Sequence, residues 1–172
     1  MTNLIKLKEG VYWVGAIDWD LRNFHGYITH RGSTYNAYLI VDEKIALVDT
    51  VKDKFFPEML ERISEIVDPS EIDYVISNHT ELDHSGSITK LLDVAKNAEL
   101  VASNFGVKNL RSYFGEGLKS TSITDKPSIN LGKKTLQFTS IPMVHWPDSM
   151  VTYIPEDKIL LSNDVFGQHI AS

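Results

Sequence analysis

Residues 72–92 read IDYVISNHTELDHSGSITKLL, and this stretch decides how we interpret the rest of the chain. Ile72 to Ile76 is a short apolar run typical of a buried strand. A polar loop follows it, and from Ile88 onward apolar residues recur at helical spacing, with Ser85 or Ser87 as the helix cap. Loops that lead from a strand into a helix carry the functional sites of α/β folds. We therefore predict a site in this loop.

Four potential metal ligands fall close together in the loop: His79, Glu81, Asp83 and His84. Alternate positions of an extended loop point the same way, so the first three can converge on one point. Imidazole and carboxylate ligands without thiolate suit zinc, iron, manganese or cobalt. A single loop carboxylate is usually solvated or interacts with a helix N-terminus. Four ligand-type residues within six positions favour a metal site over solvated loop charges.

Two further candidates follow later apolar strands, His145 and Asp164. The two oxygens of one carboxylate can each bind a different metal, so Asp164 could bridge a pair of ions. Metal pairs about 3.5–4 Å apart are a recurrent arrangement. Taken alone, Asp164 could equally be a turn residue. His25 and His30 could likewise be ordinary loop residues and not ligands, and His169 has no assigned role.

Composition narrows the possible classes of protein. The chain has 172 residues, 17 Lys and Arg against 23 Asp and Glu, and no Cys. This length suits one domain or most of one, and the acidic balance argues against a nucleic-acid binder. The absence of Cys excludes disulfide scaffolds, thiolate zinc fingers and iron–sulfur clusters. We find neither a signal peptide nor a membrane span, and expect a cytoplasmic protein with no nucleic-acid or membrane partner.

The remaining sequence predicts a mixed α/β layer fold, with helices packed on a largely β core. Residues 18–33 are rich in Gly, Asn, Asp and His and are expected to form a long loop. The other predicted elements are hairpins over 35–48, 129–141 and 150–161, helices over 55–67 and 104–113, and a strand over 100–102.

Three blocks of sequence resemble the flavodiiron proteins, also called A-type flavoproteins. These blocks are HTELDH at 79–84, HWPDSM at 145–150 and SNDVFGQ at 162–168, and the stretches at 15–27 and 34–39 are similar too. The resemblance covers the whole chain. It implies a metallo-β-lactamase-like αββα sandwich that holds a non-haem diiron site.

The resemblance also implies a ligand set. One iron would be held by His79, Glu81 and His145, the other by Asp83 and sometimes His84, with Asp164 as the bridge. Zinc hydrolases of the same fold usually carry His at the position of Glu81. A carboxylate there stabilises ferric iron relative to a neutral imidazole, so we expect O2 or NO chemistry rather than hydrolysis.

By resemblance, the enzyme reduces O2 to water or NO to N2O with electrons from FMN and from a rubredoxin or flavin-type donor. His25 and Tyr35 would lie behind the ligands and supply hydrogen bonds or protons, and Trp146 would form a pocket wall that faces the flavin. Trp146 could equally be an ordinary core aromatic. Two alternatives stay open: a zinc-dependent hydrolase of the same fold, and a non-catalytic diiron module that senses O2.

Members of this family continue with the rest of the sandwich, a further His ligand and a flavodoxin-like FMN domain. We expect residues 1–172 to be the N-terminal portion of the diiron domain, with a fold incomplete at its C-terminus. We expect FMN not to bind to this chain alone. Because an incomplete sandwich exposes an apolar face and a strand edge, we also expect a homodimer, with intertwined strands as one form.

Overall fold

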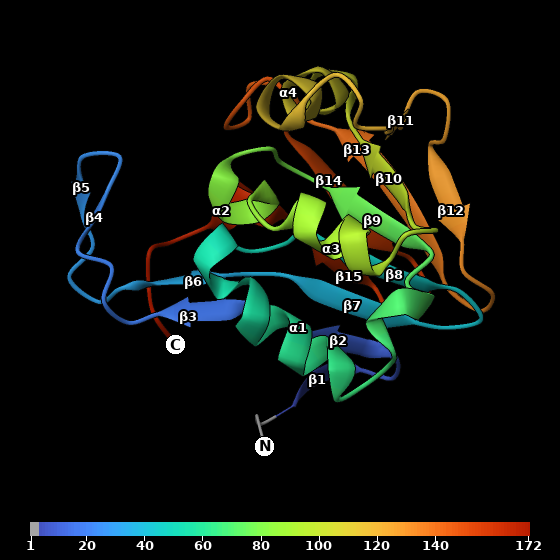
Figure 1. Cartoon of the computed structure of the whole chain (residues 1–172), viewed down its shortest axis with the longest axis horizontal. Coiled ribbons are helices and arrows are strands. Elements are labelled where there is room, and N and C mark those ends of the chain that lie inside the picture. The colour runs from blue at the N-terminus through green and yellow to red at the C-terminus, as the bar shows by residue number, and fades with distance from the viewer. Residues whose placement is uncertain (1–3) are drawn as a thin grey trace.

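The computed structural model describes residues 4–172 and arranges them in three layers: helices, a large sheet and a small sheet (Figure 1). The large sheet consists, in spatial order, of β1 (Ile5–Lys8), β2 (Val11–Trp13), β7 (Tyr38–Val41), β8 (Ile45–Val48), β9 (Tyr74–Ser77), β10 (Glu99–Ala102) and β11 (Thr121–Ser122). The small sheet consists of β12 (Ser128–Asn130), β13 (Thr135–Ser140), β14 (Met150–Ile154) and β15 (Ile159–Leu161).

Strand directions divide the large sheet into two parts. Strands β8, β9, β10 and β11 pair in parallel, whereas β1, β2, β7 and β8 pair antiparallel. Every pairing in the small sheet is antiparallel. The parallel part needs crossover segments, and these contain the helices and the loop with the predicted ligands.

The helices are α1 (Phe56–Ser64), α2 (Leu82–Ser85), α3 (Ile88–Val94) and α4 (Asn104–Phe114), with short 3₁₀ turns at η1 (Asp53–Phe55), η2 (Pro69–Glu71) and η3 (Asn163–Phe166). Pro57 occupies the first turn of α1, as predicted. Ser103 caps α4 through the backbone N–H of Gly106. Ser87 is the N-cap residue of α3, as predicted, but its hydroxyl donates to the carbonyl of Val51 at 2.8 Å and makes no capping hydrogen bond.

Two apolar cores lie on opposite faces of the large sheet, because successive strand residues point to opposite sides. One core joins the sheet to the helices and includes Leu47, Val75 and Leu91. The other joins the two sheets and includes Ile76 and Met150. Burial on both faces explains why the strand that precedes the ligand loop reads as a continuous apolar run.

The long loop predicted for residues 18–33 is wrong in part. Strand β3 (Ala16–Asp18) pairs with β6 (Ser33–Tyr35), and between them β4 (Asn23–Phe24) and β5 (Tyr27–Ile28) form a small hairpin. The two central residues of its turn, His25 and Gly26, both have positive φ, as a two-residue hairpin turn requires. These strands are too short to give an alternating pattern.

The carboxyl ends of β8, β9 and β15 meet at one place. Asp49 follows β8, Asn78 follows β9, and Asn163 follows β15, and hydrogen bonds join these three residues. No helix in the described range 4–172 has the length and apolar character needed to cross a bilayer.

Candidate metal centre

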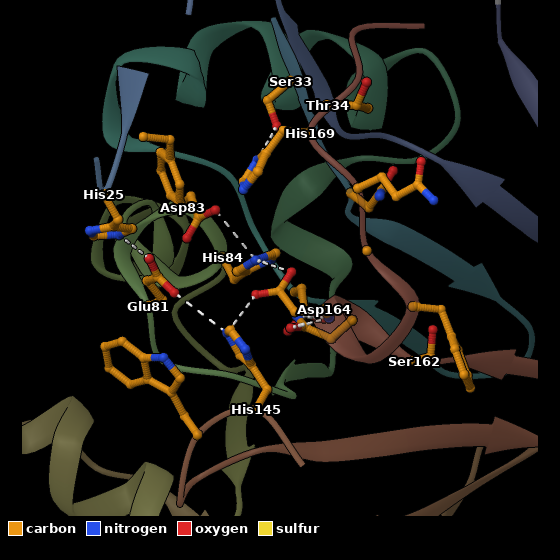
Figure 2. Close-up of a pocket in the computed structure, with 18 of the residues that line it drawn as sticks. His25, Ser33, Thr34, Glu81, Asp83, His84, His145, Ser162, Asp164 and His169 are labelled. Atoms are coloured by element: carbon orange, nitrogen blue, oxygen red, sulfur yellow. Dashed lines mark hydrogen bonds and ion pairs between the residues drawn. The ribbon is translucent and has the colours of Figure 1, made fainter. Parts of the chain in front are cut away.

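Two short segments bring most of the predicted ligands to the end of β9. His79 and Glu81 lie in the loop after this strand, and Asp83 and His84 lie in α2. All four were expected in the loop, so the helical positions of Asp83 and His84 differ from the expectation. The short helix turns Asp83 and His84 toward the same cleft as Glu81 (Figure 2).

His145 and Asp164 reach the same place from the small sheet. His145 lies in the loop between β13 and β14, and Asp164 lies in η3, directly after β15. Ligand atoms of His79, Glu81, His145 and Asp164 all lie within 4.8 Å of one another. The sheet-to-sheet packing therefore collects four ligand-type side chains from three segments that are distant in sequence.

The first cluster centres on Glu81. Its Oε2 lies 3.3 Å from Nε2 of His79 and 3.8 Å from Nε2 of His145. Nε2 of His145 is in turn 3.3 Å from Oδ2 of Asp164. Two imidazoles and two carboxylates facing one point form a donor set suited to a divalent transition metal.

The second cluster uses the other oxygen of Asp164. Oδ1 of Asp164 lies 3.0 Å from Nε2 of His84, and the same nitrogen is 3.4 Å from Oδ2 of Asp83. The two oxygens of Asp164 thus face imidazoles of different clusters, as the dashed lines in Figure 2 show. This is the arrangement that a bridging carboxylate needs.

Buried polar atoms of the second cluster lack hydrogen-bond partners. They are Oδ1 of Asp83 and both ring nitrogens of His84. Nε2 of His84 lies close to Asp164, but the two groups are not aligned for a hydrogen bond. Such buried orphans are rare and costly. A carboxylate oxygen and an imidazole that the protein leaves without hydrogen bonds fit a metal-binding role, because a metal ion would take the place of the imidazole proton.

The charge balance of the cluster also favours a cation. Burial lowers the pKa of His79, but its contacts with Asp148 and Glu81 outweigh burial and raise the pKa to about 10. Burial and the neighbouring carboxylates compete in the same way at His84, whose pKa rises to about 9. Burial raises the pKa of the Asp83 carboxyl. The carboxylates thus retain positive charge on the imidazoles, and a metal ion would replace these protons.

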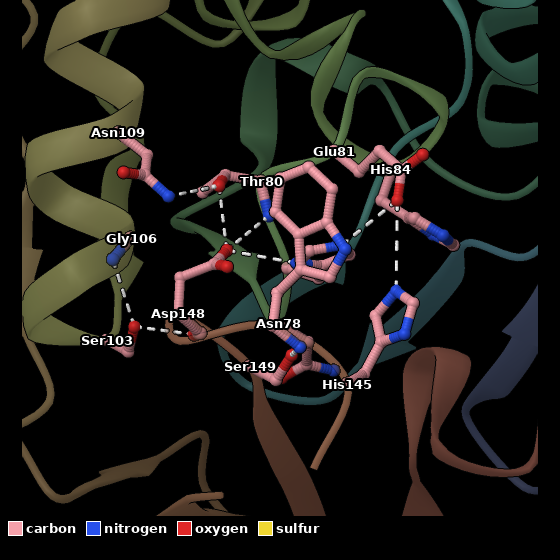
Figure 3. A network of polar contacts seen from close by, with 12 residues as sticks. Asn78, Thr80, Glu81, His84, Ser103, Gly106, Asn109, His145, Asp148 and Ser149 are labelled. Carbon is pink, nitrogen blue, oxygen red and sulfur yellow. Dashed lines mark hydrogen bonds and ion pairs between the residues drawn. The ribbon is translucent and has the colours of Figure 1, made fainter. Parts of the chain in front are cut away.

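Asp148 supports His79 from behind. Its Oδ2 accepts hydrogen bonds from Nδ1 of His79 at 3.0 Å, from the backbone N–H of Thr80 at 2.8 Å and from the Thr80 hydroxyl at 2.7 Å (Figure 3). With Nδ1 engaged, Nε2 of His79 is directed at the cluster. Ser103 donates to the Asp148 carbonyl at 2.6 Å and links this network to α4.

Asp49 holds the loops that carry the ligands. Its Oδ1 accepts from the backbone N–H of Asn78 at 2.7 Å, and its Oδ2 accepts from the side chain of Asn163 at 3.0 Å. Asn78 therefore fixes the start of the first ligand loop, and Asn163 fixes the residue before Asp164. Sequence reasoning assigned no role to Asp49 or Asp148. Asp148 lies in the HWPDSM block, which is the only signal that could have found it.

The predicted supporting residues have different outcomes. His25 contacts Oε1 of Glu81 through Nε2, and the Trp146 ring lies 5.0 Å from the His79 ring at 75° and lines the cleft. Tyr35 is buried and donates its hydrogen bond to Asp18 at 2.9 Å, not to a predicted ligand, although the charge of Asp83 acts on it. His30 is exposed.

His169 lines the cleft, and its Nδ1 lies 3.2 Å from the Ser33 hydroxyl. The cleft has a volume of about 790 Å³ and contains five of the six predicted ligands in its wall, Glu81, Asp83, His84, His145 and Asp164. This volume is ample for a diatomic molecule.

Left-handed backbone conformations gather around the site. Among the described residues, six other than Gly have positive φ, and four of them line the cleft: His25, Asp49, His145 and Asn163. Each such conformation is unfavourable for a residue with a side chain. The surrounding hydrogen bonds hold these residues in place.

Comparisons with known proteins agree with this geometry. A family model described as "ODP family beta lactamase" matches residues 34–172. The chain is 45% identical to a nitric oxide reductase of Moorella thermoacetica, over 100% of the chain and 44% of the relative. It is 42% identical to a rubredoxin-oxygen oxidoreductase of Megalodesulfovibrio gigas, over 97% of the chain and 42% of the relative.

A solved structure shows the same fold. The flavodiiron protein from Giardia intestinalis matches with a TM-score of 0.94 and 42% identity, over 100% of the chain and 42% of that structure. The chain thus spans less than half the length of each of these relatives.

Proposed function

The chain belongs to the ODP beta-lactamase family and is related to the flavodiiron proteins, and on this premise we propose that it forms the diiron part of an oxidoreductase for O2 or NO. The predicted family and the metallo-β-lactamase-like fold are both confirmed. The proposed reactions are reduction of O2 to water and of NO to N2O, each with electrons and protons in equal number.

We assign two iron positions to the two clusters. The first uses His79, Glu81 and His145, the second uses Asp83 and His84, and Asp164 bridges them. One observation carries this assignment: the two oxygens of Asp164 face imidazoles of different clusters, at 3.0 and 3.3 Å. The unpartnered atoms of Asp83 and His84 support the second position.

The donor set favours iron over zinc as the working metal. Glu81 places a carboxylate where the related zinc hydrolases usually place an imidazole, and an anionic oxygen ligand stabilises the higher oxidation state. When bound, the two irons would supply the coordination positions and the redox chemistry for a diatomic substrate. Ligand type alone is a modest guide to metal identity, so metal content is the direct test.

The protein's own residues position and shield the site. Asp148 orients His79, and His25 holds the second oxygen of Glu81, so the carboxylate keeps a defined direction. Trp146 covers one side of the His79 ring and limits the access of water. These groups fix the ligands before substrate enters, which lowers the cost of reorganisation during the reaction.

The electron source lies outside residues 1–172 in this proposal. We propose that a flavodoxin-like, FMN-binding unit delivers electrons, that a rubredoxin or flavin-type protein reduces it, and that the enzyme acts in the cytoplasm as a homodimer. The name of one relative, rubredoxin-oxygen oxidoreductase, supports a rubredoxin as the donor.

The test is metal content followed by gas consumption. Protein purified without oxygen and loaded with Fe²⁺ is expected to retain two irons per chain, a number taken from the two clusters above. With a reduced flavodoxin it is expected to consume O2 or NO, whereas Glu81→Gln protein does so poorly. Asp125→Asn is the control, because this exposed carboxylate is remote from the cleft. Retention of zinc with esterase activity would overturn the proposal, and iron retention without gas reduction would favour a sensor.

A further inference from the structure

The β4–β5 hairpin projects from the body of the molecule and yet touches the candidate metal centre (Figure 1). Its side chains Tyr27 and Ile28 are each 70% exposed, so they contribute little to a core. An isolated two-stranded hairpin is marginally stable in water. Contacts with the rest of the protein must therefore hold it in place.

The hairpin is joined to the body through Phe24 and Lys52. Nζ of Lys52 lies 4.3 Å from the centre of the Phe24 ring and 4.9 Å from the centre of the Tyr35 ring. Tyr35 is 1% exposed and is fixed by its hydrogen bond to Asp18. One ammonium group thus connects a hairpin ring to a ring of the core through cation–π contacts.

Within residues 4–172, the structure gives the Lys52 ammonium neither an ion pair nor a hydrogen bond. Its direct contacts are the faces of the two rings, and the carboxylates of Asp83, Asp18 and Glu81 act on it from further away. Burial lowers its pKa, although the nearby carboxylates Asp83 and Asp18 oppose this change. The cation–π contacts of a half-buried ammonium are stronger than those of an exposed one, because less water competes with the rings for the charge.

The same hairpin ring contacts the residue that reaches Glu81. Phe24 packs edge-to-face on the His25 ring at 4.4 Å, and Nε2 of His25 contacts Oε1 of Glu81. We propose that Lys52 is a positioning residue that clamps the hairpin against the core and thereby holds His25 on Glu81. The proposal rests on the proposed function only in taking Glu81 as a metal ligand.

Lys54 provides a matched control. It carries the same charge two residues further on, but it pairs with Asp18 at 2.9 Å and contacts Phe55 instead of Phe24. Removing Lys54 takes away one positive charge beside Asp18 and leaves both ring contacts of Lys52 in place.

Lys52 also attracts the carboxylates of Asp83 and Glu81. The His25→Gln background separates the two effects, because a direct effect of the Lys52 charge on these carboxylates would persist there, whereas the clamp acts through His25.

The first experiment is hydrogen exchange on the metal-free chain, followed in a peptide that covers the hairpin. Lys52→Met is expected to speed exchange of the hairpin amides about tenfold, because the clamp no longer opposes local opening. Lys52→Arg is expected to restore protection, since a guanidinium also stacks on aromatic rings. Lys54→Met is expected to leave the hairpin unchanged. Equal protection in Lys52→Met and wild type, or equal loss in both Met variants, would overturn the proposal.

The second experiment asks whether Lys52 acts through His25. The visible spectrum and affinity of bound Co²⁺ are compared in wild type, Lys52→Met, His25→Gln and the double variant. The two single changes are expected to perturb the spectrum alike, and the double variant is expected to add nothing further. Additive changes would contradict the proposal. If wild type binds neither Co²⁺ nor Fe²⁺, the proposed function fails. The hydrogen-exchange experiment needs no metal, so it still tests whether Lys52 holds the hairpin.

Discussion

The two halves of the candidate metal centre are built in different ways. In the first half, Asp148 anchors His79 from behind through a carboxylate that also accepts two hydrogen bonds from Thr80. In the second half, Oδ1 of Asp83 and both ring nitrogens of His84 are buried without a hydrogen-bond partner. In the first half the unsatisfied buried atom is Oδ1 of Asp148, which supports a candidate ligand, whereas in the second half the unsatisfied atoms belong to the candidate ligands themselves.

This difference indicates an order of binding. Ligands already fixed by hydrogen bonds lose little freedom when a metal arrives, so the first position should bind more tightly. The second position gains most from a metal, because the ion satisfies buried atoms that otherwise carry a desolvation cost. The metal-free protein should therefore be rigid at His79 and strained at His84.

The largest expected effect comes from Asp164, because it serves both halves. Asp164→Ala is expected to weaken Fe²⁺ binding at each position by more than about 100-fold, beyond the loss typical of a supporting residue. Anaerobic calorimetric titration of the variant would show neither binding step. A variant that kept one step intact would show that Asp164 belongs to a single position. Asp125→Asn is the control and should retain both steps.

Asp148 tests the first half alone. Asp148→Asn removes the negative charge behind His79, and we expect affinity at the first position to fall about 10- to 100-fold. The second step of the titration should be unchanged. The free energy of unfolding of the metal-free protein should also fall by about 1–3 kcal/mol, because buried hydrogen bonds to a carboxylate are weakened. Equal losses at both positions would contradict the division into two halves.

A change at His84 tests the second half of the site: here the second binding step should weaken and the first should stay unchanged. His84→Asn is expected to weaken the second binding step about tenfold and to leave the first step unchanged. Above about pH 9 the His84 imidazole loses the proton that its ion pairs with Asp164 and Asp83 favour, whereas the pKa of His79 beside Asp148 is about 10. Between these two pKa values, denaturant unfolding of metal-free His84→Asn should therefore show a smaller loss of stability than Asp148→Asn. A larger loss than in Asp148→Asn would show that His84 stabilises the fold itself.

The smallest effect on metal binding is expected for Asn163, the residue before Asp164, and it is measured as stability. Its φ is 51°, its side-chain amide donates to Asp49 at 3.0 Å, and its Oδ1 accepts from the backbone N–H of Asp164 at 2.8 Å. Asn163→Ala should lower the free energy of unfolding by about 2 kcal/mol, from backbone strain together with the lost hydrogen bonds. Asn163→Gly removes the same hydrogen bonds but tolerates positive φ, so chemical denaturation should show about half that loss. Equal losses would assign the whole effect to the hydrogen bonds.

Much of the fold could be predicted from sequence because its signals are local. The apolar run before Ser77 and the helical spacing after Ile88 reflect burial on both faces of the large sheet. The hairpin at 23–28 was missed, because two strands of two residues have no period. It is specified by the turn at His25 and Gly26 and by contacts from distant residues such as Lys52.

The ligand-type residues could be named from sequence, but not their supports. His79, Glu81 and Asp164 stand out through residue type and position after strands. Asp148 and Asp49 are single carboxylates whose roles depend on which loops meet in space, so no spacing reveals them. Tyr35 shows the converse: an aromatic residue near the motifs whose hydroxyl faces Asp18 and not the ligands.

The left-handed residues at His145, Asp49 and Asn163 limit how far this ligand set can be transplanted. A designer who copies only the histidines and carboxylates onto an idealised scaffold would inherit regular backbone at those positions. The side chains would then leave the main chain in other directions and miss the common point. A working copy must reproduce the irregular turns as well as the chemical groups.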